Sequence, residues 1–265
     1  MAERLDDLEA IGGVLDRRPL ALLTDMDGTL SPIVDRAEDA VIPEGIRRAL
    51  ADLVSRDVSV AVVTGRALAM ARRMVGVEGV DFAAGHGVDI LIGGRAERPA
   101  EIALWGERAR QAIEELRAVE REPGVWIEDK EFGLAVHYRQ AEDAEGAREA
   151  ILQAVRGSRA GSEFEVQEGR RIVELRPRLL ANKGTAASLL VARLAARGVV
   201  CLGDDVTDID MFREVRRRRE SGALEAAIVA VRSDEASEAV LANADWWVDG
   251  VEGVERVLNG MLTRV

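Results

Sequence analysis

The sequence contains a single cysteine and only two histidines among its 265 residues. Cys201 has no second thiol with which to form an intramolecular disulfide or to share a metal, and two histidines all but exclude a zinc site built from histidine and cysteine ligands. The cysteine stands within the apolar run GVVCLGDD. We therefore expect a buried strand residue in a protein of a reducing compartment.

Basic residues are also in deficit. Lysine and arginine together number 36 against 48 aspartates and glutamates, which gives a formal net charge of −12. Nucleic acid is not expected as a partner, because binding a phosphate backbone needs a basic face. No run approaches the roughly 18 consecutive apolar residues of a membrane span, and the acidic start MAERLDDLEA has no apolar signal core. We expect a cytoplasmic protein with no membrane partner.

The chain does contain short apolar runs that alternate with longer segments of helical periodicity. Each run is almost unbroken Val, Ala, Leu and Ile, which is typical of strands covered on both faces. We expect strands at 19–27, 58–64, 198–205 and 226–231, and helices at 43–56, 67–75, 184–197 and 208–215. This alternation predicts an α/β fold with a Rossmann-like parallel sheet wrapped by helices.

The middle of the chain breaks this alternation. Its segments are helix candidates at 101–121 and 141–156, and mixed apolar and charged strands within 122–140 and 162–177. Such a succession indicates an α+β insert, and strands of mixed character predict a sheet with one face open to solvent or to a ligand. We place the core at 1–94 and 180–265, and the inserted domain at 95–179.

Two acidic clusters follow two of the expected strands. Asp25 and Asp27 stand in TDMDGTLSPI, and Asp204, Asp205 and Asp208 stand in GDDVTDIDMF. Ligands of open α/β sheets bind at the carboxyl ends of the strands, and crowded carboxylates there need a cation. Ligands that are all oxygen suit Mg²⁺. A DxDG string can also be a plain turn, and Asp208 can instead begin the following helix.

Two further elements are candidates for binding a phosphate. Thr64, Gly65 and Arg66 follow the apolar run at 58–63 and open a helix, where a hydroxyl and backbone N–H groups form an anion site. Thr64 can equally be a simple helix cap. Lys183 begins a helix in NKG, and a compact ammonium at a sheet edge neutralises phosphate and crowded carboxylates, although most such lysines are solvated.

The four elements DMDGT, TGR, Lys183 and GDDVTD, in this order, resemble the motifs of the haloacid dehalogenase superfamily of aspartate-dependent phosphohydrolases. The resemblance implies that Asp25 is the nucleophile and forms an aspartyl-phosphate. It implies that Asp27 protonates the leaving oxygen and then activates water. Mg²⁺ would be bound by Asp25, the backbone carbonyl of Asp27, and Asp204.

The same resemblance gives roles to the neighbouring residues. Thr64 and Lys183 would hold the phosphoryl oxygens. Asp205 and Asp208 would position the lysine and the metal-bound waters. The fold implied is the haloacid dehalogenase type of Rossmann-like core with an inserted α+β cap domain. Phosphoryl transfer depends on alignment and charge neutralisation, so this set of residues is chemically consistent with it.

Within that superfamily the chain resembles the trehalose-6-phosphate phosphatase family over essentially its whole length. The strings that carry this are DMDGTLSPIV, TGR, GHG, IEDK, HYR, ELRP, NKG and GDDVTDIDMF. The resemblance implies that the insert is the substrate-specificity cap, in which Glu128, Lys130 and Glu174 bind sugar hydroxyls. Arg139 and Arg176 would assist with the phosphate or with domain closure. Taken singly, each of these five is more typical of an exposed strand charge.

The function implied is Mg²⁺-dependent hydrolysis of a small phosphorylated disaccharide, trehalose 6-phosphate, to trehalose and inorganic phosphate. A trehalose-phosphate synthase is the functional partner that this implies. One alternative is another capped phosphatase, acting on a glycosyl-phosphoglycerate or on sucrose phosphate. Another is a catalytically silent regulatory domain, against which the retention of Asp25, Asp27, Lys183 and Asp204 argues.

Two positions are less easily assigned. Many members of the family carry TDED where residues 207–210 are TDID, so Ile209 stands in place of a carboxylate. We expect little effect on the metal site if that side chain faces outward. His86, between two glycines, either lines the mouth of the site or has a structural role in a tight turn.

Overall fold

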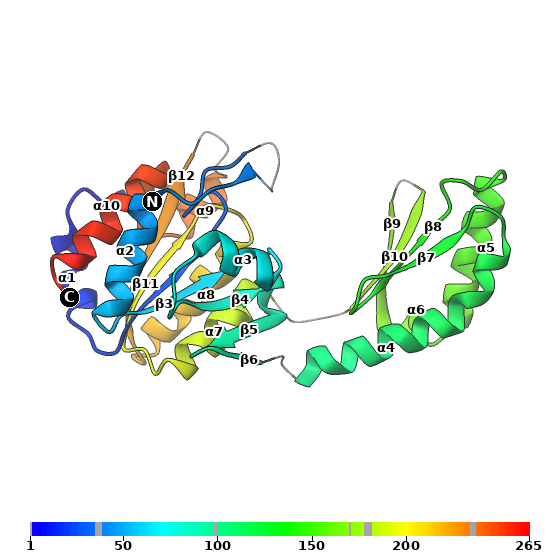
Figure 1. Ribbon diagram of the computed structural model, residues 1–265, viewed down its shortest axis with the longest axis horizontal. Helices are drawn as coiled ribbons and strands as arrows, with labels where there is room; N and C mark the ends of the chain where they lie inside the picture. The colour runs from blue at the N-terminus through cyan, green and yellow to red at the C-terminus, as the bar shows by residue number, and fades with distance from the viewer. Residues whose placement is uncertain (1, 35–38, 98–99, 170, 178–181, 234–236) are drawn as a thin grey trace. The chain divides into compact units, whose positions relative to one another are not determined.

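The structure, a computed structural model, describes residues 2–34, 39–97, 100–169, 171–177, 182–233 and 237–265 (Figure 1). The chain divides into two compact units, residues 1–97 with 181–265, and residues 98–180. Residues Arg95–Glu97 pair within the sheet of the first unit, so the boundary expected before Arg95 falls after Glu97. The boundary expected between residues 179 and 180 lies outside the described residues.

The first unit contains a nine-stranded sheet in the order β1-β13-β12-β11-β2-β3-β4-β5-β6. In this order, all neighbouring strands from β1 at one edge as far as β4 pair in parallel. The last two strands, β5 and β6, are added in antiparallel pairs. The strands are β1 (Glu3–Arg4), β2 (Leu20–Thr24), β3 (Ser59–Val63), β4 (Asp81–Ala84), β5 (Asp89–Ile92), β6 (Arg95–Glu97), β11 (Gly198–Gly203), β12 (Glu225–Arg232) and β13 (Trp246–Asp249). The predicted α/β fold with a parallel core is confirmed.

Helices cover both faces of this sheet (Figure 1). Successive strand residues face opposite sides, so Leu20 and Leu22 pack with α2, α3 and α10, while Ala21 and Leu23 pack with α7, α8 and α9. Cys201, fully buried on the second side, confirms the expectation of a strand residue. The helices and 3₁₀ turns are η1 (Leu8–Ile11), α1 (Gly12–Leu15), α2 (Glu44–Ser55), α3 (Leu68–Val75), η3 (Gly85–Gly87), α7 (Lys183–Arg193), α8 (Asp208–Glu220), α9 (Glu238–Ala242) and α10 (Gly250–Leu262).

The second unit is a four-stranded antiparallel sheet in the order β7-β8-β10-β9. Its elements are α4 (Ala100–Leu116), η4 (Arg117–Arg121), β7 (Trp126–Asp129), β8 (Leu134–His137), α5 (Ala144–Gly157), α6 (Ala160–Glu163), β9 (Phe164–Gly169) and β10 (Ile172–Pro177). Leu134, Val136, Val173 and Leu175 pack with residues of the helices in one apolar cluster. The alternate residues of the strands lie on the other face, which is the open face predicted from their mixed character.

No helix in the described part of the chain is both long enough and apolar enough to cross a membrane.

Candidate active site

The segment that follows β2 carries the first two aspartates. The backbone N–H of Asp25 donates to the carbonyl of Leu202, 3.0 Å away, which ties the end of β2 to β11. The two strands are parallel neighbours, so the acidic clusters that follow them lie together at the same edge of the sheet. The chain then turns sharply at Gly28, whose φ of +82° is costly for any residue with a side chain. Asp25 is 4% exposed.

Lys183 is the first residue of α7 and lies between two carboxylates. Its Nζ is 2.7 Å from Asp25 Oδ1 and 2.7 Å from Asp208 Oδ1, and the residue is 3% exposed. Burial acts to lower the pKa of Lys183, but the charges of Asp25 and Asp208 outweigh it and hold that pKa above its usual value. The ammonium of Lys183 is therefore placed against the expected nucleophile, Asp25.

Asp208 uses both of its oxygens within the protein. One accepts from Lys183, and Oδ2 accepts from the backbone N–H groups of Asp204, at 3.1 Å, and Asp205, at 2.9 Å. Asp208 thus fixes both the lysine and the loop after β11. Asp205 is not brought to the lysine: it is exposed, and its carboxylate accepts from Thr207 at 3.1 Å.

Asp204 lies opposite the turn that follows Asp25. Its Oδ1 accepts from Thr29 Oγ1 at 2.8 Å. A Cβ on Gly28 would come within 1.9 Å of Asp204 Oδ2, so glycine is required at position 28 for space as well as for its positive φ. Thr29 was not predicted as a site residue. The string DMDGT contains it, but only the fold shows that it reaches a carboxylate far along the chain.

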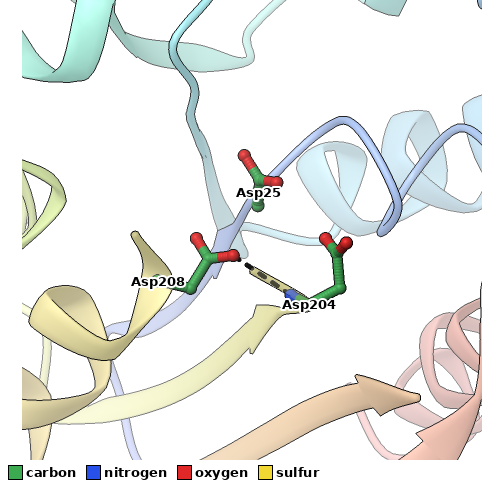
Figure 2. Close-up of side chains that lie close together, drawn as sticks. All are labelled: Asp25, Asp204 and Asp208. Atoms are coloured by element: carbon green, nitrogen blue, oxygen red, sulfur yellow. Dashed lines mark hydrogen bonds between the residues drawn. The ribbon is translucent and has the colours of Figure 1, made fainter. Parts of the chain in front are cut away.

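One carboxylate oxygen from each of Asp25, Asp204 and Asp208 lies within 4.8 Å of the other two. Figure 2 shows the three side chains close together. Burial raises the pKa of Asp25 well above its usual value, with Asp208 adding to the effect and Lys183 opposing it. Burial also raises the pKa of Asp204 to about 6. One ammonium does not neutralise this cluster, and the donors are all oxygen, so the residues fit a hard divalent cation. Both oxygens of Asp208 accept hydrogen bonds, whereas Oδ2 of Asp25 and Oδ2 of Asp204 have no bonding partner among the described residues, so Asp25 and Asp204 are the candidate ligands.

The TGR segment lies at the end of β3. Thr64 is 1% exposed, and its Oγ1 accepts from the backbone N–H of Arg66 at 3.1 Å. Helix α3 begins at Leu68 with Ala67 as its cap, so the alternative of Thr64 as a simple helix cap is wrong.

The Arg66 guanidinium makes a bidentate pair with Asp27, in which Nε donates to Oδ2 at 2.7 Å and Nη2 donates to Oδ1 at 2.6 Å. Its bonds to Asp27 raise the pKa of Arg66. A planar guanidinium holds both oxygens of a carboxylate in one orientation. Arg66 was predicted as a substrate-binding residue, and its pairing with Asp27 had no signal in the sequence.

Ile209 does not face outward. It is 6% exposed and packs in the apolar cluster between the sheet and α7–α9. A carboxylate at position 209 would face the apolar core in this chain, so an isoleucine suits this position. The side chain of His86 lies outside the described part of the structure.

In the second unit, Glu128 and Glu174 lie on the open face of the sheet, each paired in register with Ala135 of β8. Glu128 Oε1 is 2.6 Å from Lys130 Nζ, and Arg176 Nε donates to Glu174 Oε2 at 3.0 Å. The open face therefore holds two charge pairs separated by one strand. Lys130 and then His137 lower the pKa of Glu128 through their hydrogen bonds.

Arg139 is not part of this group. It follows the last paired residue of β8 and lines an open cavity of about 780 Å³ together with Glu142 and Arg171.

The fold is of the haloacid dehalogenase type, with an inserted α+β unit. A solved haloacid dehalogenase-like hydrolase from Bacteroides thetaiotaomicron shares this fold, with a TM-score of 0.58 over 91% of this chain and 98% of that one, at 15% identity. Residues 23–245 match the trehalose-phosphatase family. The chain belongs to this family.

Two relatives carry the more specific likeness. A trehalose-phosphate phosphatase of Mycolicibacterium paratuberculosis is 37% identical over 214 residues, which are 77% of this chain and 53% of that protein. The solved trehalose-6-phosphate phosphatase of Aspergillus fumigatus superposes with a TM-score of 0.69 over 100% of both chains, at 26% identity. The chain spans about half the length of the first of these relatives, and 15% of the length of another curated relative.

Proposed function

We propose that this protein is a Mg²⁺-dependent phosphatase that hydrolyses trehalose 6-phosphate to trehalose and inorganic phosphate. The observation that carries the proposal is the placement of Lys183 Nζ 2.7 Å from Asp25, with Asp204 beside them, in a chain of the trehalose-phosphatase family. This combines a nucleophile, a fixed positive charge and a place for a cation, as phosphoryl transfer requires.

In the proposed first step, an oxygen of Asp25 forms a bond to phosphorus as the bond from phosphorus to the sugar oxygen breaks. Asp27 gives its proton to that sugar oxygen, and trehalose leaves. In the second step a water attacks the aspartyl-phosphate while Asp27 takes the water's proton, which releases phosphate and restores Asp25. Thr64 and Lys183 bind the phosphoryl oxygens, and the backbone of Gly65 contributes to the same anion site.

Arg66 orients the carboxyl of Asp27 through its two hydrogen bonds, so that the same group can serve both steps. Asp25, Asp204 and the backbone carbonyl of Asp27 are the proposed ligands of Mg²⁺, with Asp208 holding the lysine beside them. When bound, Mg²⁺ neutralises the negative charge of the phosphoryl group and aligns it with the nucleophile.

Asp204→Asn is expected to raise the Mg²⁺ concentration required for half-maximal activity by about 10-fold or more, equivalent to roughly 1.4 kcal/mol of metal binding. The amide keeps the shape of the side chain and its bond with Thr29 but removes the charge. Phosphate release measured across a Mg²⁺ titration gives the value. Asp205→Asn is the matched control, since that carboxylate is exposed and bonds only Thr207 among the contacts described. An unchanged titration for Asp204→Asn would remove it from the metal.

The second unit supplies the proposed sugar recognition. Glu128, Lys130 and Glu174 bind hydroxyls of the disaccharide, and Arg176 holds Glu174 in place. We propose Arg139 and Arg176 as residues that assist with the phosphate or with domain closure, as the family resemblance implies. Binding energy from such contacts is available only to substrates that carry the matching hydroxyls.

Glu174→Ala and Lys130→Ala are therefore expected to lower kcat/KM for trehalose 6-phosphate by about 10- to 150-fold, the equivalent of one lost hydrogen bond to a charged group. Hydrolysis of a small aryl phosphate, which lacks the sugar, should change by less than about threefold on the same reasoning. Glu149→Ala, exposed on α5, controls for a lost surface charge. Parallel losses on both substrates would mean that these residues support the fold and do not recognise sugar.

The experiment that tests the function as a whole is phosphate release from trehalose 6-phosphate, glucose 6-phosphate, sucrose phosphate and a glucosyl-phosphoglycerate, with and without Mg²⁺. Preference for one of the last two would favour the alternative of a different capped phosphatase. Absence of turnover on every substrate would favour a silent regulatory domain. Because the proposed substrate is a glycosylated sugar phosphate, a trehalose-phosphate synthase is the proposed functional partner.

A further inference from the structure

Trp126 lies on the open face of the second unit's sheet rather than in its core. It opens β7 and is 44% exposed, whereas the next residue, Ile127, packs against the apolar cluster on the opposite face. Its indole stacks on the imidazole of His137, with ring centroids 4.0 Å apart and planes 8° from parallel. A large apolar ring is thus exposed to solvent, although the apolar core of this unit lies on the opposite face of the same strand.

The indole is held in place by a chain of contacts. Trp126 and His137 are directly paired in the register of β7 and β8. Nε2 of His137 is 2.8 Å from Glu128 Oε2, and the other oxygen of Glu128 is 2.6 Å from Lys130 Nζ. The imidazole is therefore fixed in orientation by the carboxylate, and the imidazole fixes the indole. A rigid aromatic side chain loses little entropy when a ligand binds.

The aromatic pair adjoins the row of residues already proposed to bind sugar. Glu128, Ala135 and Glu174 form the next row on the same face, two residues along the strands and so about 7 Å from the row of Trp126 and His137. That distance is comparable with the width of one sugar ring. A pyranose presents hydroxyls at its rim and apolar C–H groups on its faces, so it is bound by carboxylates at the rim and an aromatic ring against a face.

We propose that Trp126 is a specificity-determining residue whose indole packs against the C–H face of a pyranose ring of the substrate, while Glu128 and Glu174 hold its hydroxyls. The inference rests on the proposed function and extends it. The indole selects substrates with a sugar ring at this position, such as a disaccharide phosphate, over substrates whose phosphate is carried by a small acyclic group.

The test compares Trp126→Ala, Trp126→Phe and wild type on trehalose 6-phosphate and on a small aryl phosphate. Trp126→Ala is expected to lower kcat/KM for trehalose 6-phosphate by about 10-fold or more, mainly through KM, because it removes the stacking surface. Trp126→Phe keeps an aromatic face and should stay within about threefold of wild type, as should both variants on the aryl phosphate. Leu104→Ala, which removes an exposed apolar side chain of α4, is the control for a general effect on this unit.

Unchanged kcat/KM for trehalose 6-phosphate in Trp126→Ala would overturn the proposal. So would an equal loss on both substrates, or equal values for the alanine and phenylalanine variants. If wild type releases no phosphate from trehalose 6-phosphate, the proposed function has failed, and calorimetric titration with trehalose alone then tests the indole. If trehalose binds to wild type and not to Trp126→Ala, the proposed role of the indole in sugar binding is supported. If trehalose does not bind to wild type, that role is overturned.

Discussion

Asp25→Asn is expected to abolish hydrolysis of trehalose 6-phosphate, with a loss of at least about 10⁴-fold in kcat, because removal of a covalent nucleophile takes away the reaction path itself. An amide oxygen is a poor nucleophile and also a weaker ligand for a cation. The shape of the side chain is unchanged, and Lys183 keeps its second carboxylate, Asp208, 2.7 Å away. The protein should therefore fold normally.

Steady-state phosphate release measures the loss, and far-UV circular dichroism with thermal unfolding shows whether the fold is retained. Rapid acid quench of wild type with labelled substrate should trap a phosphoprotein that is stable in acid and absent from Asp25→Asn. Asp205→Asn, exposed in the same cluster of acidic residues, should retain most of its activity. Turnover of Asp25→Asn above a hundredth of the wild-type rate would show that another group attacks the phosphorus.

Much of the core fold follows from local properties of the chain. Runs such as LALLT and GVVCLG are almost entirely apolar, which is typical of strands covered on both faces, and they are β2 and β11. Parallel strands carry their following loops to one edge, so the meeting of Asp25 and Asp204 could be predicted from two separate motifs.

Other elements gave no such signal. Strand β1, at one edge of the sheet, has two residues, and β5 and β6, next to and at the other edge, have only four and three. β1 belongs to the sheet only because it pairs with β13, far along the chain, and β5 and β6 extend the sheet by pairing with the strand that precedes each of them. A propensity summed over three or four residues is too weak to show this.

The site residues that sequence reasoning missed are those whose role is a contact between distant segments. Thr29 is a site residue only because Asp204 lies against it, and Arg66 is a partner of Asp27 only because β2 and β3 are neighbours. The orientation of Ile209 likewise depends on how α8 packs on the sheet. Trp126 reads in the sequence as one more apolar strand residue, and only the register shows that it shares a face with Glu128 and Glu174.

The distribution of lysine is a further argument for the assigned site. The chain has 36 lysines and arginines, of which only Lys130 and Lys183 are lysines. Among the described residues, the surface ion pairs other than those of Glu128 with Lys130 and His137 are made by arginine, as in Arg47 with Glu44 and Arg232 with Asp249. Where only a positive charge is needed, this chain uses a guanidinium. Position 183 is therefore one at which the smaller ammonium is required.

Lys183→Arg is accordingly expected to reduce kcat for trehalose 6-phosphate by about 10²- to 10³-fold, the usual effect of displacing one donor that stabilises developing charge. The charge is kept, but the space between Asp25 and Asp208 is closed to solvent, with the lysine 3% exposed, and the planar guanidinium needs more of it.

Lys130→Arg controls for the replacement itself. That side chain is 47% exposed, so a guanidinium has room there, and its proposed contact is with the sugar alone, so an effect is expected on KM and kcat at saturating trehalose 6-phosphate should fall by less than about threefold. The measurement is phosphate release at saturating Mg²⁺, with thermal unfolding to show that both variants are folded. A Lys183→Arg variant that is folded and nearly as active as wild type would mean that charge alone suffices at this position. The short contacts of Nζ with the two carboxylates would then have no part in the reaction.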